Sequence, residues 1–442
     1  MKTKSYLLAF VSMIFLIVSC TEMDLLPEPE SDLVLKSSSS KLKVAVITDI
    51  HYMDHSLLPE NPEENADFQY LLFTSYNKMI ELSEPIFLKT VSELKNEKPD
   101  VLLVTGDLAF NGEKVNHEIV KTKLQELSNA GTQVLVIPGN NDINSPDAKL
   151  YEGTGSTPIS NITPEEFATI YGDFGYNEAL YKDDHSLSYI FKLRDDLWIL
   201  GIDACIYAPT NERNGEININ TLSWIQEKMA EANENGITVL AMMHFGIGEH
   251  YKDQRILLPT DLVNNFDIVS TSLMEAGIRF VFTGHSHAND IVELNANGNS
   301  MYDIETGSLI TPLSPYRIVT LNDNFIKIET KRITSIDSKA MPKGESFIVY
   351  SDSYLVEHLD LFFSWYLVYG FKLPSSMAEA YLPYLRNSMM AQFAGDEQLL
   401  PPEERKIEEL KEMFPENPVE SIIKNLWNDL PPADDKLYLK IK

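Results

Sequence analysis

Short apolar runs alternate with amphipathic stretches along most of this chain. Three runs rich in Val, Leu and Ile are bounded by polar or Gly residues and are too short for core helices, so each predicts a buried strand. Two amphipathic stretches lie between them, one at residues 85–98 and one from Val115 to near Gly131, and both predict helices. Strand, helix and strand in this order predict a largely parallel sheet with helices on its faces. The three strands are expected at residues 43–48, 101–105 and 133–137.

The alternation of strands and helices continues to about residue 335, with one irregular interruption. Residues 144–186 contain Gly, Pro and Asn clusters and a short helical candidate at 163–171, and we expect an excursion beside a site. Beyond Ala288 strands follow one another without helices, so the first domain is expected to span residues 42–335. The remaining strands are expected at residues 187–193, 197–202, 237–243, 278–283, 290–294, 301–305, 316–321 and 325–332, and the remaining helices at 221–233 and 261–276.

Residues 345–442 are richer in helical, aromatic and acidic patterns and predict a helical appendage on the α/β body. The segment 352–371 is rich in Leu, Phe, Trp and Tyr, Pro374 breaks it, and segments 403–413 and 419–430 are amphipathic. A lipid-facing or substrate-gripping role for the aromatic segment is an alternative. Buried aromatic core is the more common outcome, so a packed appendage is expected.

The first twenty residues have the pattern of an export signal. Lys2 and Lys4 precede an apolar run too short to span a bilayer, which ends at Ser19 and Cys20. A small residue before a Cys at this position resembles the bacterial lipobox, whose Cys becomes the lipidated first residue of the mature protein. We expect a signal peptide over residues 1–20, lipidation at Cys20, and a flexible tether over residues 21–41. The protein would then be anchored to a membrane at the periplasm or cell surface. An ordinary signal peptide with an incidental Cys is the alternative.

Composition narrows the classes of function. The formal net charge is -30 at pH 7, and nonspecific nucleic-acid binding requires a basic face, so that class is excluded. If Cys20 is lipidated, Cys205 is the only remaining thiol and no intramolecular disulfide can form. Cys205 lies in a strand-like run and is expected to be a small buried core residue.

Five predicted strand ends carry polar residues that can bind metal. Carboxyl ends of parallel strands meet at one edge of a sheet, so these side chains are expected to lie together. Imidazoles, carboxylates and an amide oxygen at one place predict a metal site, and mixed nitrogen and oxygen ligands suit Zn, Mn, Fe or Ni. The five blocks are Asp49-Ile50-His51, Gly106-Asp107, Gly139-Asn140-Asn141-Asp142, His244 and Gly284-His285-Ser286-His287.

In this order, over residues 43 to about 335, the blocks resemble those of the calcineurin-like metallophosphoesterase family. The resemblance implies a four-layer α/β/β/α sandwich, here with a C-terminal helical appendage, and two divalent metal ions bridged by Asp107. It implies that one metal is held by Asp49, His51, Asp107 and His287. It implies that the other is held by Asp107, Asn140, His244 and His285.

Two adjacent cations clamp a phosphoryl group and turn a shared water into a hydroxide nucleophile. In the family, a His after Gly-Asn interacts with the phosphoryl oxygens and protonates the leaving group. This chain has Asn141 there, and an amide cannot transfer a proton near neutral pH. Loss of a general acid costs about 10²–10⁴ in rate. Replacement candidates are His55 and His250, with His117 and His185 weaker, and Asp142 either orients a neighbour of the metals or caps the loop.

The resulting expectation is an exported, lipid-anchored phosphoesterase that hydrolyses a phosphodiester or phosphomonoester by metal-bound hydroxide. Its substrate is expected to be a small molecule, and no specific protein partner is predicted. Residues 144–160 and 311–317 are expected to shape specificity, with Arg317 facing a substrate anion. One alternative, motivated by Asn141, is a catalytically weak lipoprotein that binds metal or a phosphate ligand. Another is a protein phosphatase, which requires an open groove.

Overall fold

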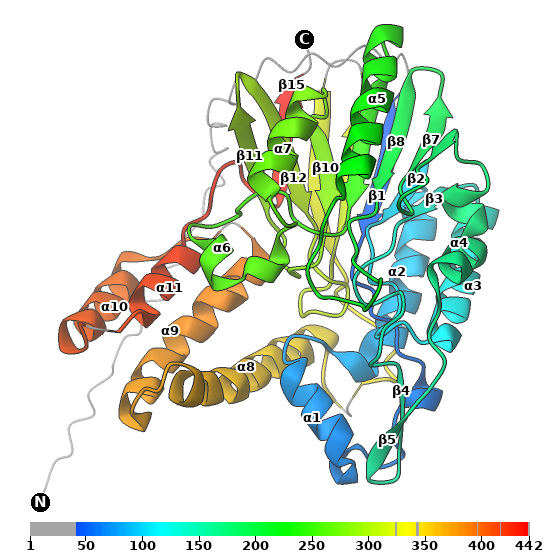
Figure 1. The fold of residues 1–442 in the computed structure, drawn as a ribbon. Coiled ribbons are helices and arrows are strands. Elements are labelled where there is room, and N and C mark those ends of the chain that lie inside the picture. Colours follow the sequence, from blue (N-terminus) through cyan, green and yellow to red (C-terminus); the bar gives the residue numbers. More distant parts are fainter. Residues whose placement is uncertain (1–40, 323–324, 342–343, 396, 416, 441–442) are drawn as a thin grey trace, which may run out of the picture.

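The computed structural model describes residues 41–322, 325–341, 344–395, 397–415 and 417–440 of the 442-residue chain. The expected signal peptide, Cys20 and nearly all of the expected tether lie outside these residues. The described residues form two β-sheets with covering helices, and a C-terminal group of helices beside them (Figure 1). None of their helices is long and apolar enough to cross a membrane.

Two mixed β-sheets form the centre of the molecule. One has the strand order β15-β14-β13-β1-β2-β3 and the other the order β11-β12-β10-β9-β8-β7-β6. The first sheet consists of β1 (Leu42–Ile47), β2 (Val101–Val104), β3 (Gln133–Val136), β13 (Pro315–Leu321), β14 (Phe325–Arg332) and β15 (Lys436–Lys440). The second consists of β6 (Tyr181–Lys182), β7 (Tyr189–Arg194), β8 (Leu197–Ile202), β9 (Thr238–Met243), β10 (Phe280–Thr283), β11 (Ile291–Ala296) and β12 (Asn299–Glu305).

Parallel pairing occurs in one block of neighbouring strands in each sheet. β1, β2 and β3 are parallel to one another, and so are β8, β9, β10 and β12. The other pairings are antiparallel, those of β13, β14 and β15 on the first sheet and those of β11, β7 and β6 on the second. The prediction of a largely parallel sheet therefore holds for β1, β2 and β3 and for β8, β9, β10 and β12, but not for the remaining strands. Neighbouring strands joined by short turns pair antiparallel.

Helices cover the outer face of each sheet, which gives the body four layers (Figure 1). α2 (Ser83–Glu97) and α3 (Lys114–Asn129) bury their apolar faces in the core of the first sheet. α5 (Ile219–Asn235) and α7 (Phe266–Glu275) do the same on the second sheet. Leu103 of the first sheet and Leu240 of the second belong to one apolar cluster, so the inner faces share a core. The expected α/β/β/α sandwich is confirmed.

Smaller elements lie outside the two sheets. α4 (Pro164–Ile170) begins where the sequence predicts it, because Thr163 and Glu166 form a reciprocal capping box. Phe68 and Tyr151 pack edge to face at 5.4 Å, which joins two elements that periodicity did not predict. These smaller elements also include α1 (Ala66–Thr74), β4 (Lys149–Glu152), β5 (Gly155–Pro158) and α6 (Gln254–Leu257).

The C-terminal helices form an apolar core of their own. On α8, Leu359 and Phe363 are buried in this core, whereas Trp365 is 47% exposed. Tyr369 lies in the short segment Tyr366–Gly370 after α8 and is 68% exposed. After the helices the chain returns to the body, where β15 pairs with β14. The described residues between 345 and 440 therefore form a helical appendage that ends in a strand of the first sheet. The helices are α8 (Phe347–Trp365), α9 (Ser375–Ala394), α10 (Pro401–Met413) and α11 (Val419–Leu426).

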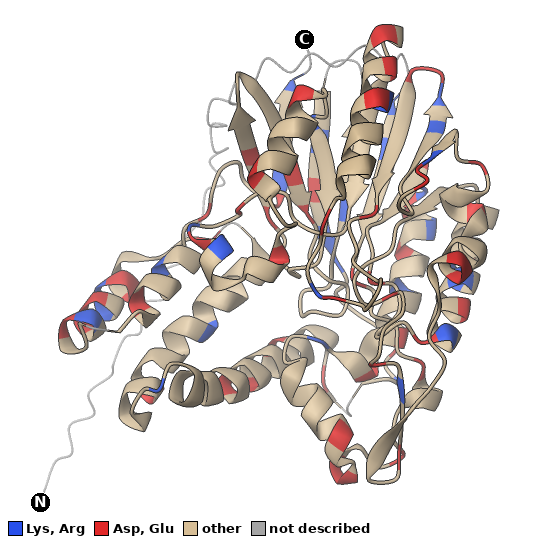
Figure 2. Ribbon diagram, in the orientation of Figure 1, with Lys and Arg blue, Asp and Glu red and all other residues tan. Residues whose placement is uncertain are grey.

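Charged residues are distributed over both parts of the fold. Asp and Glu occur on helices and loops of the body and of the appendage, with Lys and Arg among them (Figure 2). This spread fits a role of the acidity in solubility, because a steering surface would gather charge of one sign at one place.

Candidate metal centre

Five strand ends deliver their polar side chains to one place between the sheets. Asp49 follows β1, Asp107 follows β2 and Asn140 follows β3, while His244 follows β9 and His285 follows β10. Nearly all of these side chains are buried, with Asp49 and His244 at 0% exposure and Asp107 at 2%. The site therefore forms at the carboxyl edge of the parallel strands of both sheets, as the sequence predicts.

The backbone at these strand ends is left-handed. Asp49, His51, Asp107, His285 and His287 all have φ between 41° and 77°. Residues other than Gly rarely adopt this conformation, and it is found where tertiary structure and function impose it. Concentration of five such residues at one site points to a functional constraint on the backbone.

Close packing explains the glycines that precede the ligand candidates. A Cβ on Gly139 would lie 2.2 Å from Asp107 Oδ1, and a Cβ on Gly284 would lie 2.1 Å from Thr48 Oγ1. A Cβ on Gly106 would lie 2.5 Å from His244 Nδ1, and this glycine also has a φ of +99°. Any larger residue at these positions would displace a side chain that forms the site.

One group of ligand atoms is formed by Asp49, His51 and His287. The two Nε2 atoms of His51 and His287 lie 3.2 Å apart. Asp49 Oδ1 lies 3.5 Å from His51 Nε2 and 3.4 Å from His287 Nε2. No described residue forms a hydrogen bond with Asp49 Oδ1, although it is fully buried. A cation among these three atoms would satisfy the carboxylate and both imidazoles.

A second group is formed by Asn140, His244 and His285. His244 Nε2 lies 3.1 Å from Asn140 Oδ1 and 3.2 Å from His285 Nδ1. Asp107 joins the two groups, because its Oδ2 lies 3.5 Å from both His51 Nε2 and His244 Nε2. A carboxylate has enough lone pairs to bind two cations, so Asp107 is placed to bridge them.

Hydrogen bonds to carbonyl oxygens orient two of the imidazoles. His244 Nδ1–H donates to Thr105 O at 2.8 Å, and His285 Nε2–H donates to Thr260 O at 3.1 Å. The opposite ring nitrogen of each then presents a lone pair to the second group of ligand atoms. The donor set fits two divalent metals with mixed nitrogen and oxygen ligands, which is the expected chemistry of Mn, Fe, Zn or Ni.

The electrostatics of the site favour cation binding. Burial lowers the pKa of His285 to about 3 and that of His287 to about 4, which keeps these imidazoles neutral. Burial acts to raise the pKa of Asp49, but the charges of His244 and His287 hold it well below its usual range. Burial acts against protonation of His244 as well, yet Asp107 and Asp49 raise its pKa to about 9, so a metal ion at its Nε2 would displace a proton. The carboxylates are thus ionised at neutral pH and attract positive charge.

The loop after β3 binds the expected bridging carboxylate. Asn141 donates to both oxygens of Asp107, from its main-chain N to Oδ1 at 2.8 Å and from Nδ2 to Oδ2 at 2.6 Å. Asp142 accepts three main-chain hydrogen bonds, from Leu108 and Ala109 at Oδ1 and from Gly139 at Oδ2. Of the two roles expected for Asp142, these hydrogen bonds match a cap of the loop.

Three of the histidines considered as replacement acids have partners elsewhere. The side chain of His55 is 80% exposed beside Asp54 and Glu84. His250 is buried between Asp290 and Asp303. His117 lies beneath the loop, with Nε2 at 3.0 Å from Asp142 O and Nδ1 at 2.8 Å from the Tyr171 hydroxyl.

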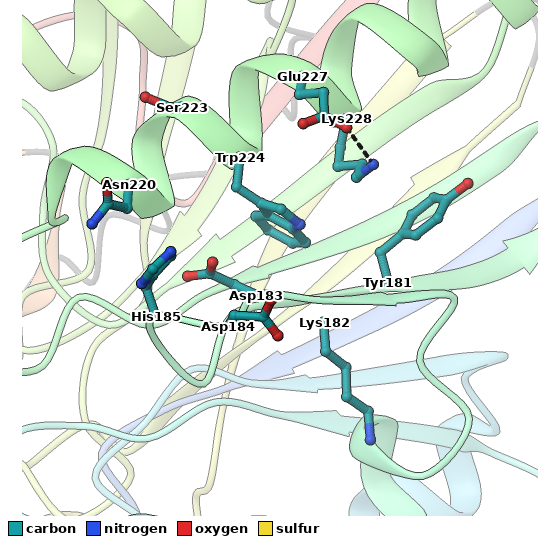
Figure 3. A pocket seen from close by; sticks show the side chains of 10 residues that line it. All are labelled: Tyr181, Lys182, Asp183, Asp184, His185, Asn220, Ser223, Trp224, Glu227 and Lys228. Carbon is teal, nitrogen blue, oxygen red and sulfur yellow. Dashed lines mark hydrogen bonds and ion pairs between the residues drawn. The ribbon is translucent and has the colours of Figure 1, made fainter.

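The fourth histidine, His185, lines a separate cavity of about 440 Å³ beside α5. Figure 3 shows His185 beside Asp183 and below Trp224, with Lys228 and Tyr181 at the other end of the cavity. None of the residues that line this cavity is a candidate metal ligand. His185 therefore has no evident part in the chemistry of the metal centre.

The expectation that Arg317 faces a substrate is wrong. The side chain is completely buried, and its guanidinium donates to the main-chain oxygens of Glu305, Asp290 and Asp434. These bonds tie β13 to neighbouring segments of the body. A buried guanidinium with carbonyl partners is structural and cannot reach solvent.

The segment that precedes α2 approaches the metal centre, and no sequence pattern predicts this. The ammonium of Lys78 lies 5.7 Å from the centre of the Phe110 ring, and its charge acts on Asp107 and Asp49. Asn77 Nδ2 lies 3.4 Å from His287 Nδ1. The Tyr354 hydroxyl of α8 donates to Lys78 O at 2.7 Å, so the appendage supports this segment. No motif marks these residues, and only their position in space brings them to the site.

Comparison with known proteins identifies the body. A family model described as calcineurin-like phosphoesterase matches residues 42–289 of this chain. No curated protein matches the chain significantly.

Solved structures of similar fold include a dimetal phosphatase from Danio rerio, with 13% sequence identity and a TM-score of 0.48. The match covers 66% of this chain and 96% of that protein. A conserved uncharacterised protein from Streptococcus pneumoniae, a predicted phosphoesterase, shows 11% identity and a TM-score of 0.26 over 67% of this chain and 91% of its own. Vacuolar protein sorting 29 from Cryptosporidium parvum shows 13% identity and a TM-score of 0.24, with coverages of 66% and 92%.

Proposed function

Because the chain belongs to the calcineurin-like phosphoesterase family and is therefore a metal-dependent hydrolase of phosphate esters, we propose that it hydrolyses a small-molecule phosphodiester or phosphomonoester outside the cytoplasm. The observation that carries the proposal is the pair of ligand groups that share Asp107. Export and anchoring rest on the sequence of residues 1–20, with Cys20 as the lipidated residue.

The ligand roles follow from the two groups of atoms. Asp49, His51 and His287 would hold one metal ion and Asn140, His244 and His285 would hold the other, with Asp107 shared by both groups. Two divalent metals at such a site bind the phosphoryl oxygens, neutralise developing charge and activate the attacking water. Thr105 and Thr260 keep the rings of the second group turned toward the metal.

Two further residues act on the substrate and on the bridge. Lys78 contributes a positive charge beside the metal centre and is placed to bind a phosphate oxygen. Asn141 fixes the orientation of Asp107 with two hydrogen bonds. Since neither of them replaces the imidazole acid that the family carries, the enzyme should favour esters whose leaving group needs no proton.

The test is steady-state hydrolysis of an aryl phosphodiester and the matching monoester by the metal-loaded protein, with Asp107→Asn as the blank. Turnover that disappears in the blank supports the proposal, and much slower turnover of alkyl esters supports the leaving-group preference. Metal content is measured in the same samples, because loss of turnover must accompany loss or displacement of metal at the bridge.

The second candidate function is a lipoprotein that binds metal or a phosphate ligand with little turnover. Asn141 motivates it, since the group that would transfer a proton is missing. Protein shown to carry two metals but without turnover of either aryl ester above the blank would favour this candidate over the enzyme. A protein phosphatase would instead require an accessible groove for a chain segment, and a phosphopeptide added to the same assay tests for one.

A further inference from the structure

A second group of buried carboxylates lies away from the metal centre, where the appendage meets the body. Asp290, Glu397 and Asp434 each place a carboxylate oxygen so that the three atoms lie within 4.8 Å of one another. Asp290 immediately precedes β11, Glu397 follows α9, and Asp434 precedes β15. All three residues lie beyond the range 42–289 that matches the family model.

Glu397 has no evident compensation for its burial. The residue is only 7% exposed, and neither carboxylate oxygen accepts a hydrogen bond from another described residue. A buried carboxylate without partners costs several kcal/mol unless a cation or a proton neutralises it. Its oxygens point at Asp290 and Asp434, which are themselves acidic, so the missing partner must be positive.

Cationic side chains near the group are already engaged. His250 Nδ1 lies 2.9 Å from Asp290 Oδ1, and the same ring faces Asp303 and Glu305. The Arg317 guanidinium donates to the main-chain oxygens of Glu305, Asp290 and Asp434 and to the Thr330 hydroxyl. Gln392 of α9 donates to Asp290 Oδ2 at 3.2 Å, and the Ile291 N–H donates to Asp434 Oδ1 at 2.8 Å. Negative charge therefore remains in excess around Glu397.

The three segments are held in place by contacts outside the group. Arg332 donates to Ala394 O at the end of α9 and to Asp435 Oδ1, both at 2.8 Å. A Cβ on Gly395 would lie 2.4 Å from Asn289 O and 3.0 Å from Asp434 Cβ, so the chain packs tightly there. The carboxylates are thus brought together by a rigid junction and not by flexible surface side chains.

We propose that Asp290, Glu397 and Asp434 bind a Ca²⁺ ion that fastens the C-terminal appendage to the phosphoesterase body. Ca²⁺ binds oxygen ligands at 2.3–2.6 Å, so two ligands of one ion lie at most about 5 Å apart. The oxygens of this group satisfy that limit. An all-oxygen set of carboxylates suits a hard cation and distinguishes this site from the imidazole-rich metal centre.

The competing explanation is a trapped proton. Burial, with Asp290 and Asp434 close by, raises the pKa of Glu397 to about 10, so in the absence of a cation the carboxyl is neutral. Under that explanation, Glu397→Gln mimics the native state and calcium affects neither protein. Under the calcium-site proposal, the ion displaces the proton and stabilises the junction.

The experiment is a calcium titration of the full chain after its dimetal centre has been loaded with Mn²⁺ and free metal removed. Isothermal titration and the thermal unfolding midpoint are measured for the native protein, Glu397→Gln and the matched control Glu412→Gln, an exposed position on α10. The native protein and the control are expected to bind one Ca²⁺ per chain and to unfold at higher temperature with calcium. Glu397→Gln is expected to bind calcium at least about 10-fold more weakly, with unchanged Mn²⁺ content.

Two further variants keep the result interpretable. Asp107→Asn should retain calcium binding, which separates this site from the metal centre. Asp434→Asn repeats the test if Glu397→Gln does not fold. The proposal is overturned if the native protein binds no calcium, if it binds Mg²⁺ in preference, or if calcium binding survives in both cluster variants. The native titration alone decides the first two outcomes, whether or not any variant folds.

Discussion

Buried carboxylates gather at two places in this molecule, around Asp107 at the strand ends and around Glu397 at the junction with the appendage. The first place combines Asp49 and Asp107 with four imidazoles and an amide. The second has carboxylates alone, and its residues have no left-handed backbone. At the metal centre, the ligands follow strands of the family domain. At the junction, the carboxylates come from three segments, and the first and last of these lie more than a hundred residues apart in the sequence.

The difference shows that neighbouring groups determine the pKa of a buried carboxyl and therefore the kind of cation it can bind. Imidazoles and opposing charges keep Asp49 ionised with its pKa well below its usual range. At the junction, burial and acidic neighbours raise the pKa of Glu397 instead. A site with neutral nitrogen ligands suits the catalytic metals, while an oxygen-only site with excess negative charge suits a structural cation.

The largest expected difference between the two groups is the effect on turnover of substituting one acid in each. Asp49→Asn removes an ionised ligand, and metal stabilisation of the transition state is worth several kcal/mol, so we expect turnover to fall by about 10³-fold or more. Glu397→Gln should keep most of its turnover and lose the stabilisation by calcium. The measurements are kcat/KM on an aryl ester and the unfolding midpoint. Comparable losses of turnover in both variants would contradict the separation.

The next largest expected effect is the change in turnover when an imidazole is introduced at position 141 of the metal centre. Asn141→His restores a proton donor, and a general acid contributes about 10²–10⁴ in rate. We expect the lower end, about 10²-fold, on alkyl esters, because Asp142 is bound to main-chain N–H groups and cannot orient the new ring. Aryl esters should gain little. Asn141→Gln is the control, and an equal gain on both ester types would contradict the role.

Lys78 beside the metal centre is a further contrast with the junction, where Arg317 is bound to carbonyls. Lys78→Met should reduce kcat/KM by about 10- to 100-fold, the loss expected for one charged hydrogen bond to substrate. Lys78→Arg keeps the charge and should lose less. Metal content should be unchanged in both variants. If Lys78→Met retains native kcat/KM, the residue has no part in substrate binding.

Glu113 shows the effect of burial on a single carboxyl and can be compared with both groups. It is fully buried, and no other carboxylate is among its hydrogen-bond partners in the described residues. Burial raises its pKa to about 7. When a carboxyl has a higher pKa in the folded state than in the unfolded state, the unfolding free energy of the protein falls as pH rises through the two pKa values. For Glu113 this interval runs from about 4.5 to about 7, and the loss persists at higher pH. Relative to Glu113→Gln, the native protein should lose about 3 kcal/mol of unfolding free energy over this interval.

Urea unfolding at pH 5 and pH 8 measures this difference. The two proteins should differ mainly in the change between the two pH values, because the amide does not titrate. Parallel loss of stability in native protein and variant would show that Glu113 is not the titrating group.

Much of the fold was predictable because its signals are local. The central strands and α2, α3 and α5 follow from apolar periodicity, which depends on neighbouring residues alone. α9 was missed because Pro383 interrupts its pattern, and helical geometry continues through that position only with tertiary support. β15 was missed because five residues carry little periodic signal, and its partner β14 lies about a hundred residues earlier.

The candidate site shows the same division. Each of the seven expected ligands follows a strand that local pattern identifies, so their meeting could be inferred from strand ends. Arg317 was misplaced because the sequence does not show which charged residue a strand buries. Lys78 and Asn77 reach the site through an irregular segment, and Tyr354 supports that segment from α8.

The sequence by itself determined the family, the strand ends and the kinds of ligand atom available, because short motifs encode local backbone and local chemistry. Only the tertiary structure decided which oxygens and nitrogens face each other, which histidines are excluded, and that three distant carboxylates meet at the junction. The physical reason is that burial and charge at a point in space depend on packing between segments that no local pattern relates.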